Sequence, residues 1–103
     1  MTTPRFDELI HPGTRLSIVA LLASADWAEF AFLRDQLELS DSALSKPLST
    51  LEEAGYVNID RPVRDHRRRL RARLTGVGRA AFEGHVAALQ QIVGTGDLER
   101  TAV

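Results

Sequence analysis

The 103-residue sequence predicts one mainly helical α+β domain that carries a single small β-hairpin. Three observations lead to this prediction. Apolar residues recur at helical spacing in four stretches, two five-residue stretches alternate between apolar and polar side chains, and the length suits one domain. We expect the domain to span residues 1–93, and we expect residues 94–103, which contain two glycines and mixed charge, to form a disordered tail.

The first two predicted helices span residues 15–24 and 32–39. Apolar side chains lie on every side of the first helix, so it must be covered all round, which one small domain does not achieve alone. The connection at residues 25–30 has room for one short strand. Ala31 stands at the cap position of the second helix and cannot bind the free backbone amides, so we expect that helix to fray at its start.

The third predicted helix lies between Ser40, a suitable N-cap, and Gly55, which favours the left-handed turn that ends a helix. Pro47 removes one backbone donor inside this helix, so we expect a bend or a widened turn there. An apolar side faces the core, and the opposite side is short and polar. Such a face, followed by a strand and a basic turn, is typical of a helix that enters a DNA groove, although an ordinary surface helix is the alternative. The polar face consists of Ser42, Ser45, Lys46, Ser49 and Glu53.

Residues 56–60 and 70–74 alternate with matching period and predict two strands of a hairpin, joined by a long loop at 61–69. The charge distribution singles out this hairpin. Residues 1–60 hold four basic and ten acidic residues, whereas residues 61–73 hold seven arginines and one aspartate. The net charge of −1 therefore conceals a strongly basic hairpin, and a phosphate backbone responds to that local field.

Thr75 is the expected cap of the last helix, which spans residues 76–93. Its apolar arc covers about half of the circumference, wider than the stripe of ~100° that one contact requires. We therefore expect one contact with the domain and a second with another copy of the chain. His85 lies within this arc, so we expect a buried or interfacial histidine and not a metal ligand.

Several function classes are excluded by the composition. The chain has no cysteine, no apolar run of the roughly 18 residues that span a membrane, and no signal-peptide pattern at its start, so we expect a cytoplasmic protein. No nucleophile stands beside a base, and no metal cluster or phosphate-binding glycine loop is present. We expect neither catalytic activity nor a metal or cofactor.

Four segments resemble the small winged-helix transcriptional regulators of the MarR/ArsR type. They begin at His11, Phe30, Leu44 and Arg73, and the most specific signatures are Leu-Glu-Glu-Ala-Gly-Tyr-Val and Leu-Thr-x-x-Gly-Arg. The resemblance covers roughly residues 9–93. It implies that the third helix lies in the major groove of double-stranded DNA, that the hairpin is a wing on the flanking minor groove, and that the first and last helices form a homodimer.

The leading hypothesis is a homodimeric transcriptional regulator, with repression as the expected outcome. A protein-interaction module whose basic hairpin binds an acidic partner is the alternative, and the sequence identifies no small-molecule effector, although a pocket between dimer helices could hold one. The expected DNA-binding residues are Ser42, Ser45, Lys46, Ser49, Arg64, Arg67, Arg68, Arg69 and Arg71. The expected dimer residues are Leu16, Val19, Phe82, Val86, Leu89 and Val93.

Overall fold

The computed structural model describes residues 2–61, 63–64, 67–68 and 70–102, and among these it describes the side chains of residues 2–61 and 70–94. The elements follow the predicted order, so the α+β fold class is confirmed. The helices are α1 (Gly13–Ala23), α2 (Phe30–Gln36), α3 (Asp41–Glu53) and α4 (Gly76–Ala102). The strands are β1 (Ala28–Glu29), β2 (Val57–Asp60), β3 (Val63–Arg64), β4 (Arg67–Arg68) and β5 (Arg71–Leu74).

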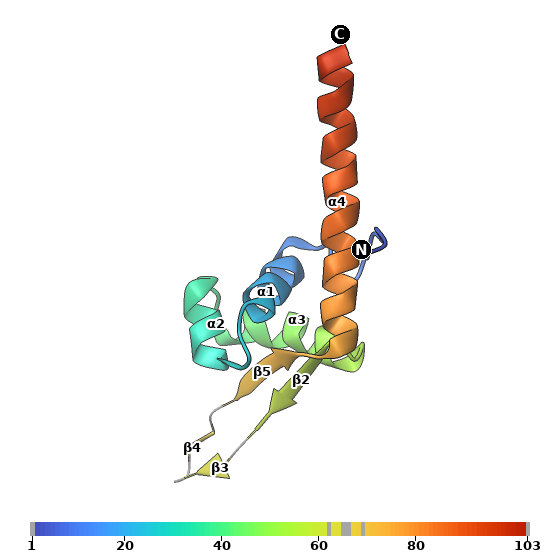
Figure 1. Ribbon diagram of the computed structural model, residues 1–103. Coiled ribbons are helices and arrows are strands. Elements are labelled where there is room, and N and C mark those ends of the chain that lie inside the picture. The colour runs from blue at the N-terminus through green and yellow to red at the C-terminus, as the bar shows by residue number, and fades with distance from the viewer. Residues whose placement is uncertain (1, 62, 65–66, 69, 103) are drawn as a thin grey trace.

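Strands β1, β5 and β2 form a three-stranded antiparallel sheet in that order. Ala72 of the central strand β5 lies opposite Ala28 of β1 and Ile59 of β2. Strands β3 and β4 pair with each other and extend the hairpin away from the helices (Figure 1). The predicted hairpin is therefore present, and its loop contains a second, shorter pair of strands.

The core lies between helices α1, α2 and α3 and one face of the sheet. Each element contributes fully or almost fully buried apolar side chains, and burial of a leucine or isoleucine stabilises the fold by about 1.5–3 kcal/mol. Helix α1 buries one face and leaves Leu16 and Leu21 half-buried on its other sides. The core residues of these elements are Ile18, Val19, Leu22, Ala28, Leu33, Leu44, Leu48, Leu51, Val57, Ala72 and Leu74.

Helix α2 starts two residues earlier than the sequence predicts, so the expected cap at Ala31 was wrong. Glu29 is the N-cap residue, and its side chain makes no capping hydrogen bond. The Phe30 amide instead donates to the Leu70 carbonyl at 2.8 Å. Because β1 pairs with β5 and leads directly into the helix, the sheet satisfies one of the backbone donors that have no partner within the helix. Helix α2 ends at Gln36, and Glu38 beyond it adopts a left-handed backbone with φ of 54°.

Helix α3 has the predicted boundaries. The Ser40 hydroxyl accepts a hydrogen bond from the Ala43 amide at 3.1 Å, as an N-cap does. Gly55 has φ of +81°, the left-handed conformation expected just past the helix end. Helical residues continue on both sides of Pro47, and the bend expected there stays a prediction.

Thr75 joins the end of α3 to the start of α4. Its hydroxyl accepts from the Gly78 amide at 2.9 Å, which confirms the predicted cap, and it donates to the Gly55 carbonyl at 2.7 Å. The Thr75 amide donates to the Tyr56 carbonyl at 3.0 Å. A Cβ atom on Gly78 would lie 2.1 Å from that carbonyl oxygen, so only glycine allows this close approach.

Helix α4 continues to Ala102, where a disordered tail was expected from Gly94 onward. Each glycine lowers helix stability by about 1 kcal/mol relative to alanine, so two separated glycines weaken a helix without necessarily ending it. The helix extends well beyond the rest of the molecule (Figure 1). The whole molecule measures 63 × 27 × 20 Å along its principal axes. Within the described residues, no helix combines the length and the apolar character that a membrane crossing requires.

Candidate nucleic-acid interface

Helix α3 presents the predicted polar face to solvent. Its apolar residues Leu44, Leu48 and Leu51 are buried, which fixes the rotation of the helix and directs the opposite side outward. Lys46 is exposed and carries the only positive charge of this face. The side chains that the helix places on the exposed side, as predicted, are Ser42, Ser45, Lys46 and Ser49.

Two of these serines are already engaged within the chain. The Ser45 hydroxyl donates to the Asp41 carbonyl at 2.8 Å, and the Ser42 hydroxyl lies 3.3 Å from that of Ser40. A serine whose proton is donated to its own helix can only accept a hydrogen bond from a base edge. Ser49 and Lys46 therefore have greater freedom than Ser42 and Ser45 to donate a hydrogen bond to a base edge.

Arg34 of α2 stabilises the start of α3. Its guanidinium lies 3.0 Å from the Asp41 carboxylate and 3.1 Å from that of Asp35. The hydrogen bond that Arg34 donates to Asp41, followed by the one that it donates to Asp35, raises the pKa of Arg34 above its ordinary value. This arginine connects α2 with α3, the two helices of the helix-turn-helix unit. Its guanidinium is already paired with these carboxylates.

The wing, defined as residues 57–74, holds its described arginines in two different environments. Arg61 makes two contacts of 3.3 Å with the Glu52 carboxylate of α3, and Arg71 lies 2.8 Å from the Asp60 carboxylate on β2. Both ion pairs are solvent-exposed, so each contributes about 0–1 kcal/mol to stability. Among the described residues, no carboxylate pairs with Arg73.

Four arginines of the predicted binding set belong to the tip of the wing. Arg64 and Arg67 lie opposite each other where β3 pairs with β4, and Arg68 is the next residue of β4. Their side chains lie outside the described residues, and Arg69 lies outside them entirely. The backbone thus brings Arg64, Arg67 and Arg68 together beyond the end of the sheet.

Trp27 contacts the wing in a way that the sequence did not reveal. The guanidinium carbon of Arg71 lies 4.4 Å from the Trp27 ring centroid, and that of Arg73 lies 5.1 Å from it. Trp27 directly precedes Ala28, which faces the core, so Trp27 points to the opposite face of the sheet. The sequence signal for this contact was that side chains along residues 27–29 alternate between the two faces of the sheet. The indole face favours a nearby cation by about 0.5–1 kcal/mol.

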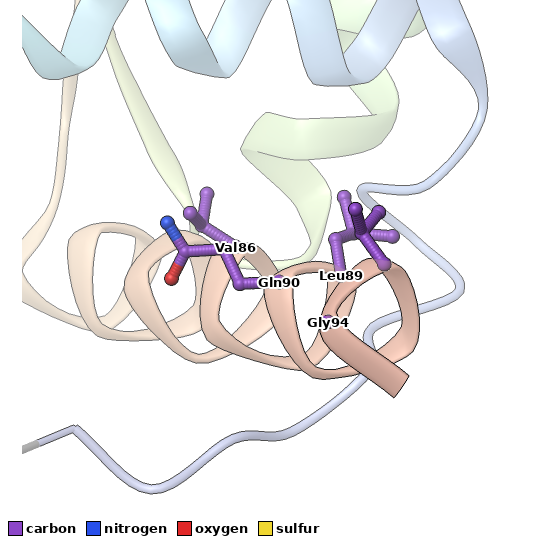
Figure 2. A pocket seen from close by; sticks show the side chains of 5 residues that line it. Val86, Leu89, Gln90 and Gly94 are labelled. Atoms are coloured by element: carbon purple, nitrogen blue, oxygen red, sulfur yellow. The ribbon is translucent and has the colours of Figure 1, made fainter. Parts of the chain in front are cut away.

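The outer part of α4 carries an apolar groove. Val86 and Leu89 are half-buried, whereas Ile92 and Val93 expose 60% and 63% of their surface. Figure 2 shows the side chains of Val86 and Leu89 rising from the same side of the helix. The residues that line the groove are Val86, Leu89, Gln90, Val93 and Gly94.

The remaining expected dimer residues have different positions. Phe82 is half-buried and packs against the core, and Leu16 of α1 is half-buried. Val19 is fully buried within the single chain. Because Val19 has no exposed surface, it belongs to the core and is removed from the set of residues that could touch a partner.

Among the described residues, no group of three or more histidine, aspartate or glutamate side chains is arranged to hold a metal ion. The candidate interface consists of the polar face of α3 and the basic hairpin. The sequence of residues 14–93 matches the protein family described as the winged helix DNA-binding domain. The chain belongs to the family of winged helix DNA-binding domains. This assignment confirms the resemblance on which the hairpin was interpreted as a wing.

The winged helix has relatives of similar length. The uncharacterized protein MJ0432 of Methanocaldococcus jannaschii is 33% identical over 85 residues, which are 82% of this chain and 92% of that protein. The structure of a transcriptional regulator homologue protein from Pyrococcus horikoshii OT3 is 22% identical with a TM-score of 0.83, over 88% of this chain and 90% of that one.

A protein of Enterococcus faecalis V583 assigned to the MarR family of transcriptional regulators is also similar in structure. It is 19% identical with a TM-score of 0.74, and the match covers 92% of this winged helix and 84% of that chain. At these identities the two solved structures support the fold, while the family match carries the DNA-binding assignment.

Proposed function

We propose that this chain is a homodimeric transcriptional regulator that binds double-stranded DNA in the cytoplasm. The observation that carries the proposal is the exposed polar face of α3 beside an arginine-rich wing, in a chain that belongs to the winged helix DNA-binding family. Helix α3 would enter the major groove, and the wing would contact the flanking minor groove and phosphates. Similar structures include proteins described as transcriptional regulators, which supports this role.

Most of the affinity would come from the wing. Arg61 and Arg71 are already paired with carboxylates, so we expect them to contribute less to phosphate binding than the other arginines of the wing. Each phosphate that an arginine neutralises makes the negative slope of log K against log salt steeper by about 0.9. The residues proposed for this role are Arg64, Arg67, Arg68 and Arg69 of the tip, with a smaller share from Arg71, which is paired with Asp60.

Helix α3 would supply the sequence preference. Lys46 can donate a hydrogen bond to guanine, and the Ser49 hydroxyl makes no hydrogen bond with any described residue. Ser42 and Ser45 would contribute less, because their hydroxyls already bind within the chain. Direct readout by short serines is modest, so we expect DNA shape to contribute a large share of the specificity.

The groove on α4 supports the homodimer. Its exposed residue Val93 continues from the half-buried Val86 and Leu89 along a helix that extends beyond the domain. A second copy would cover this apolar surface, with Leu16 and Phe82 at its inner end. A dimer would also place two α3 helices on successive half-sites of a pseudo-palindromic duplex.

Repression is the expected outcome of DNA binding, and a small-molecule effector is a further element of the proposal. The structurally similar protein NadR was solved in complex with 4-hydroxyphenylacetate. In this chain, a ligand held between the dimer helices would change the distance between the two α3 helices if it bound one arrangement of the dimer more tightly than another.

Selection of bound fragments from a random duplex pool tests the function directly. We expect enrichment of a pseudo-palindrome, and we expect Lys46→Ala to change the preferred bases more than the affinity for unselected DNA. A variant with Arg79→Ala, which removes one charge on α4 outside the proposed interface, is the control. Absence of any enriched sequence, with retention of an acidic protein partner, would instead favour the interaction module.

A further inference from the structure

The segment before α1 runs along helix α4 near the middle of its described part (Figure 1). The Arg5 amide donates to the Gly84 carbonyl at 2.8 Å, and the Asp7 amide donates to Nδ1 of His85 at 2.9 Å. A Cβ atom on Gly84 would lie 3.3 Å from the Thr3 carbonyl oxygen, so this small residue lets the segment approach closely. Residues far apart in the sequence are thereby held together.

Asp7 extends this contact to the end of α3. Its Oδ2 atom accepts from the Tyr56 hydroxyl at 2.6 Å, and its Oδ1 atom accepts from the amides of Leu9 and Ile10 at 2.9 and 3.3 Å. The hydrogen bond to Asp7 raises the pKa of the Tyr56 hydroxyl. Tyr56 directly follows the glycine that ends α3. Asp7 therefore connects the end of the proposed DNA-reading helix to α4.

His85 provides the α4 side of this connection. Its ring has no exposed surface, and because Nδ1 accepts a hydrogen bond, the neutral ring carries its proton on Nε2. The Nε2 atom has no hydrogen-bond partner among the described residues. The Phe6 ring lies 4.8 Å away between centroids, and the His11 ring lies 5.4 Å away.

Burial lowers the pKa of His85 below its ordinary value of 6.5, with a smaller effect in the same direction from His11 and an opposing one from Asp7. These are the titratable groups that face the ring from the preceding segment. Beyond them, Arg5 and Tyr56 lie near Asp7, and Glu83 on α4 accepts from the Thr2 hydroxyl at 3.4 Å. On α1, Arg15 donates to the Leu9 carbonyl.

We propose that Asp7 is a positioning residue that holds the end of α3 against α4, and that His85 releases it when the imidazole gains a proton. A protonated imidazole has two N–H donors and no acceptor. The Asp7 amide would then face a second donor, and the hydrogen bond between them is lost. The bonds from Asp7 to Tyr56 and to the next amides do not involve this nitrogen, so the segment leaves α4 first.

The consequence for DNA binding rests on the proposed function. Helix α4 carries the proposed dimer surface, and α3 carries the proposed base contacts. When the Asp7 connection is broken, the two α3 helices of a dimer are held less firmly at the spacing of about 34 Å that successive half-sites require. Acidification would therefore weaken binding to the palindrome more than binding to a single half-site.

Amide hydrogen exchange of the free protein tests the connection without DNA. Between about pH 7.5 and pH 5.5 we expect the protection factor of the Asp7 amide to fall by up to about tenfold, the limit for one histidine, while that of Leu51 in the core changes less. His85→Asn retains an acceptor oxygen near the position of Nδ1 and cannot be protonated in this range. In that variant we expect constant protection of Asp7.

His11→Asn is the matched control, because it removes the neighbouring titratable ring and leaves the Nδ1 acceptor in place. We expect this variant to retain the loss of protection at low pH. Constant Asp7 protection in the wild-type protein would overturn the proposal, and so would an equal loss in His85→Asn. If a variant fails to fold, the pH dependence of Asp7 exchange in the wild-type protein still tests the proposal.

Binding to the selected palindrome supplies the second readout. We expect the ratio of Kd at about pH 5.5 to Kd at about pH 7.5 to be at least fivefold larger for the wild type than for His85→Asn. Equal ratios, with the Asp7 exchange behaving as expected, would overturn the coupling to α3. Loss of Asp7 protection in a protein that binds no DNA would support the connection while removing the proposed function.

Discussion

Gly78→Ala is predicted to destabilise the fold at the junction of α3, β2 and α4. The added Cβ atom would lie 2.1 Å from the Tyr56 carbonyl oxygen, 2.8 Å from its carbon and 2.9 Å from the Tyr56 Cα atom. All three are backbone atoms, and Tyr56 is held between Gly55 and the paired strand β2. To make room for the Cβ atom, the backbone around Tyr56 and the start of α4 must therefore move apart. Overpacking typically costs about 1–3 kcal/mol, and we expect the upper end, about 3 kcal/mol.

Gly76→Ala is the matched control for this prediction. It lies two residues earlier in the same helix, and a Cβ atom there would meet nothing within 4 Å. We expect no loss of stability, or a gain of up to about 1 kcal/mol from higher helix propensity. Urea denaturation followed by circular dichroism, at one fixed protein concentration, measures both variants. A loss below about 1 kcal/mol for Gly78→Ala, or equal losses for the two glycines, would refute the close approach to Tyr56.

Three further variants test separate contacts. Glu38→Gly should stabilise the protein by about 1 kcal/mol in the same denaturation assay, because φ of 54° is unfavourable for a residue with a Cβ atom. Trp27→Leu should raise the Kd for DNA about two- to fivefold if the indole positions Arg71 and Arg73, and an unchanged Kd would remove that role. Because the folded-state pKa of His85 is lowered, its contribution to stability is complete above 6.5 and decreases as the pH falls below 6.5. The difference between the wild type and His85→Asn, measured on both sides of pH 6.5, isolates this contribution.

Much of the fold follows from local patterns. The alternation at residues 56–60 and 70–74 predicted the hairpin, and the spacing of Leu44, Leu48 and Leu51 predicted the buried side of α3. Ser40, Gly55 and Thr75 act within a few residues of their own position, so their capping roles could be predicted from the sequence.

The features that the sequence did not predict depend on contacts between distant residues. Helix α2 starts at Phe30 because its amide binds the Leu70 carbonyl, and only the register of the sheet brings the two together. Trp27 meets Arg71 and Arg73 for the same reason. The bond between Asp7 and His85 spans 78 residues, and no local pattern indicates it.

The polar face of α3 was predicted as a set of exposed side chains, and the structure shows that set. It also shows that the hydroxyl of Ser45 is occupied within the helix. The pairing of Arg61 with Glu52 and of Arg71 with Asp60 reduces the free charge of the wing from the value counted in the sequence. These details shift the expected affinity toward the tip of the wing.

The salt dependence of DNA binding tests the central claim most directly. Fluorescence anisotropy with a selected duplex, at several salt concentrations, compares the wild type with the double variant Arg67→Ala and Arg68→Ala and with the control Arg79→Ala. We predict that the double variant binds every duplex more weakly and that its slope of log K against log salt is shallower by about 2 per bound subunit, or about 4 for the dimer. Arg79→Ala should leave the slope unchanged. Identical slopes for the wild type and the double variant would contradict the assignment of residues 57–74 as a DNA-binding wing.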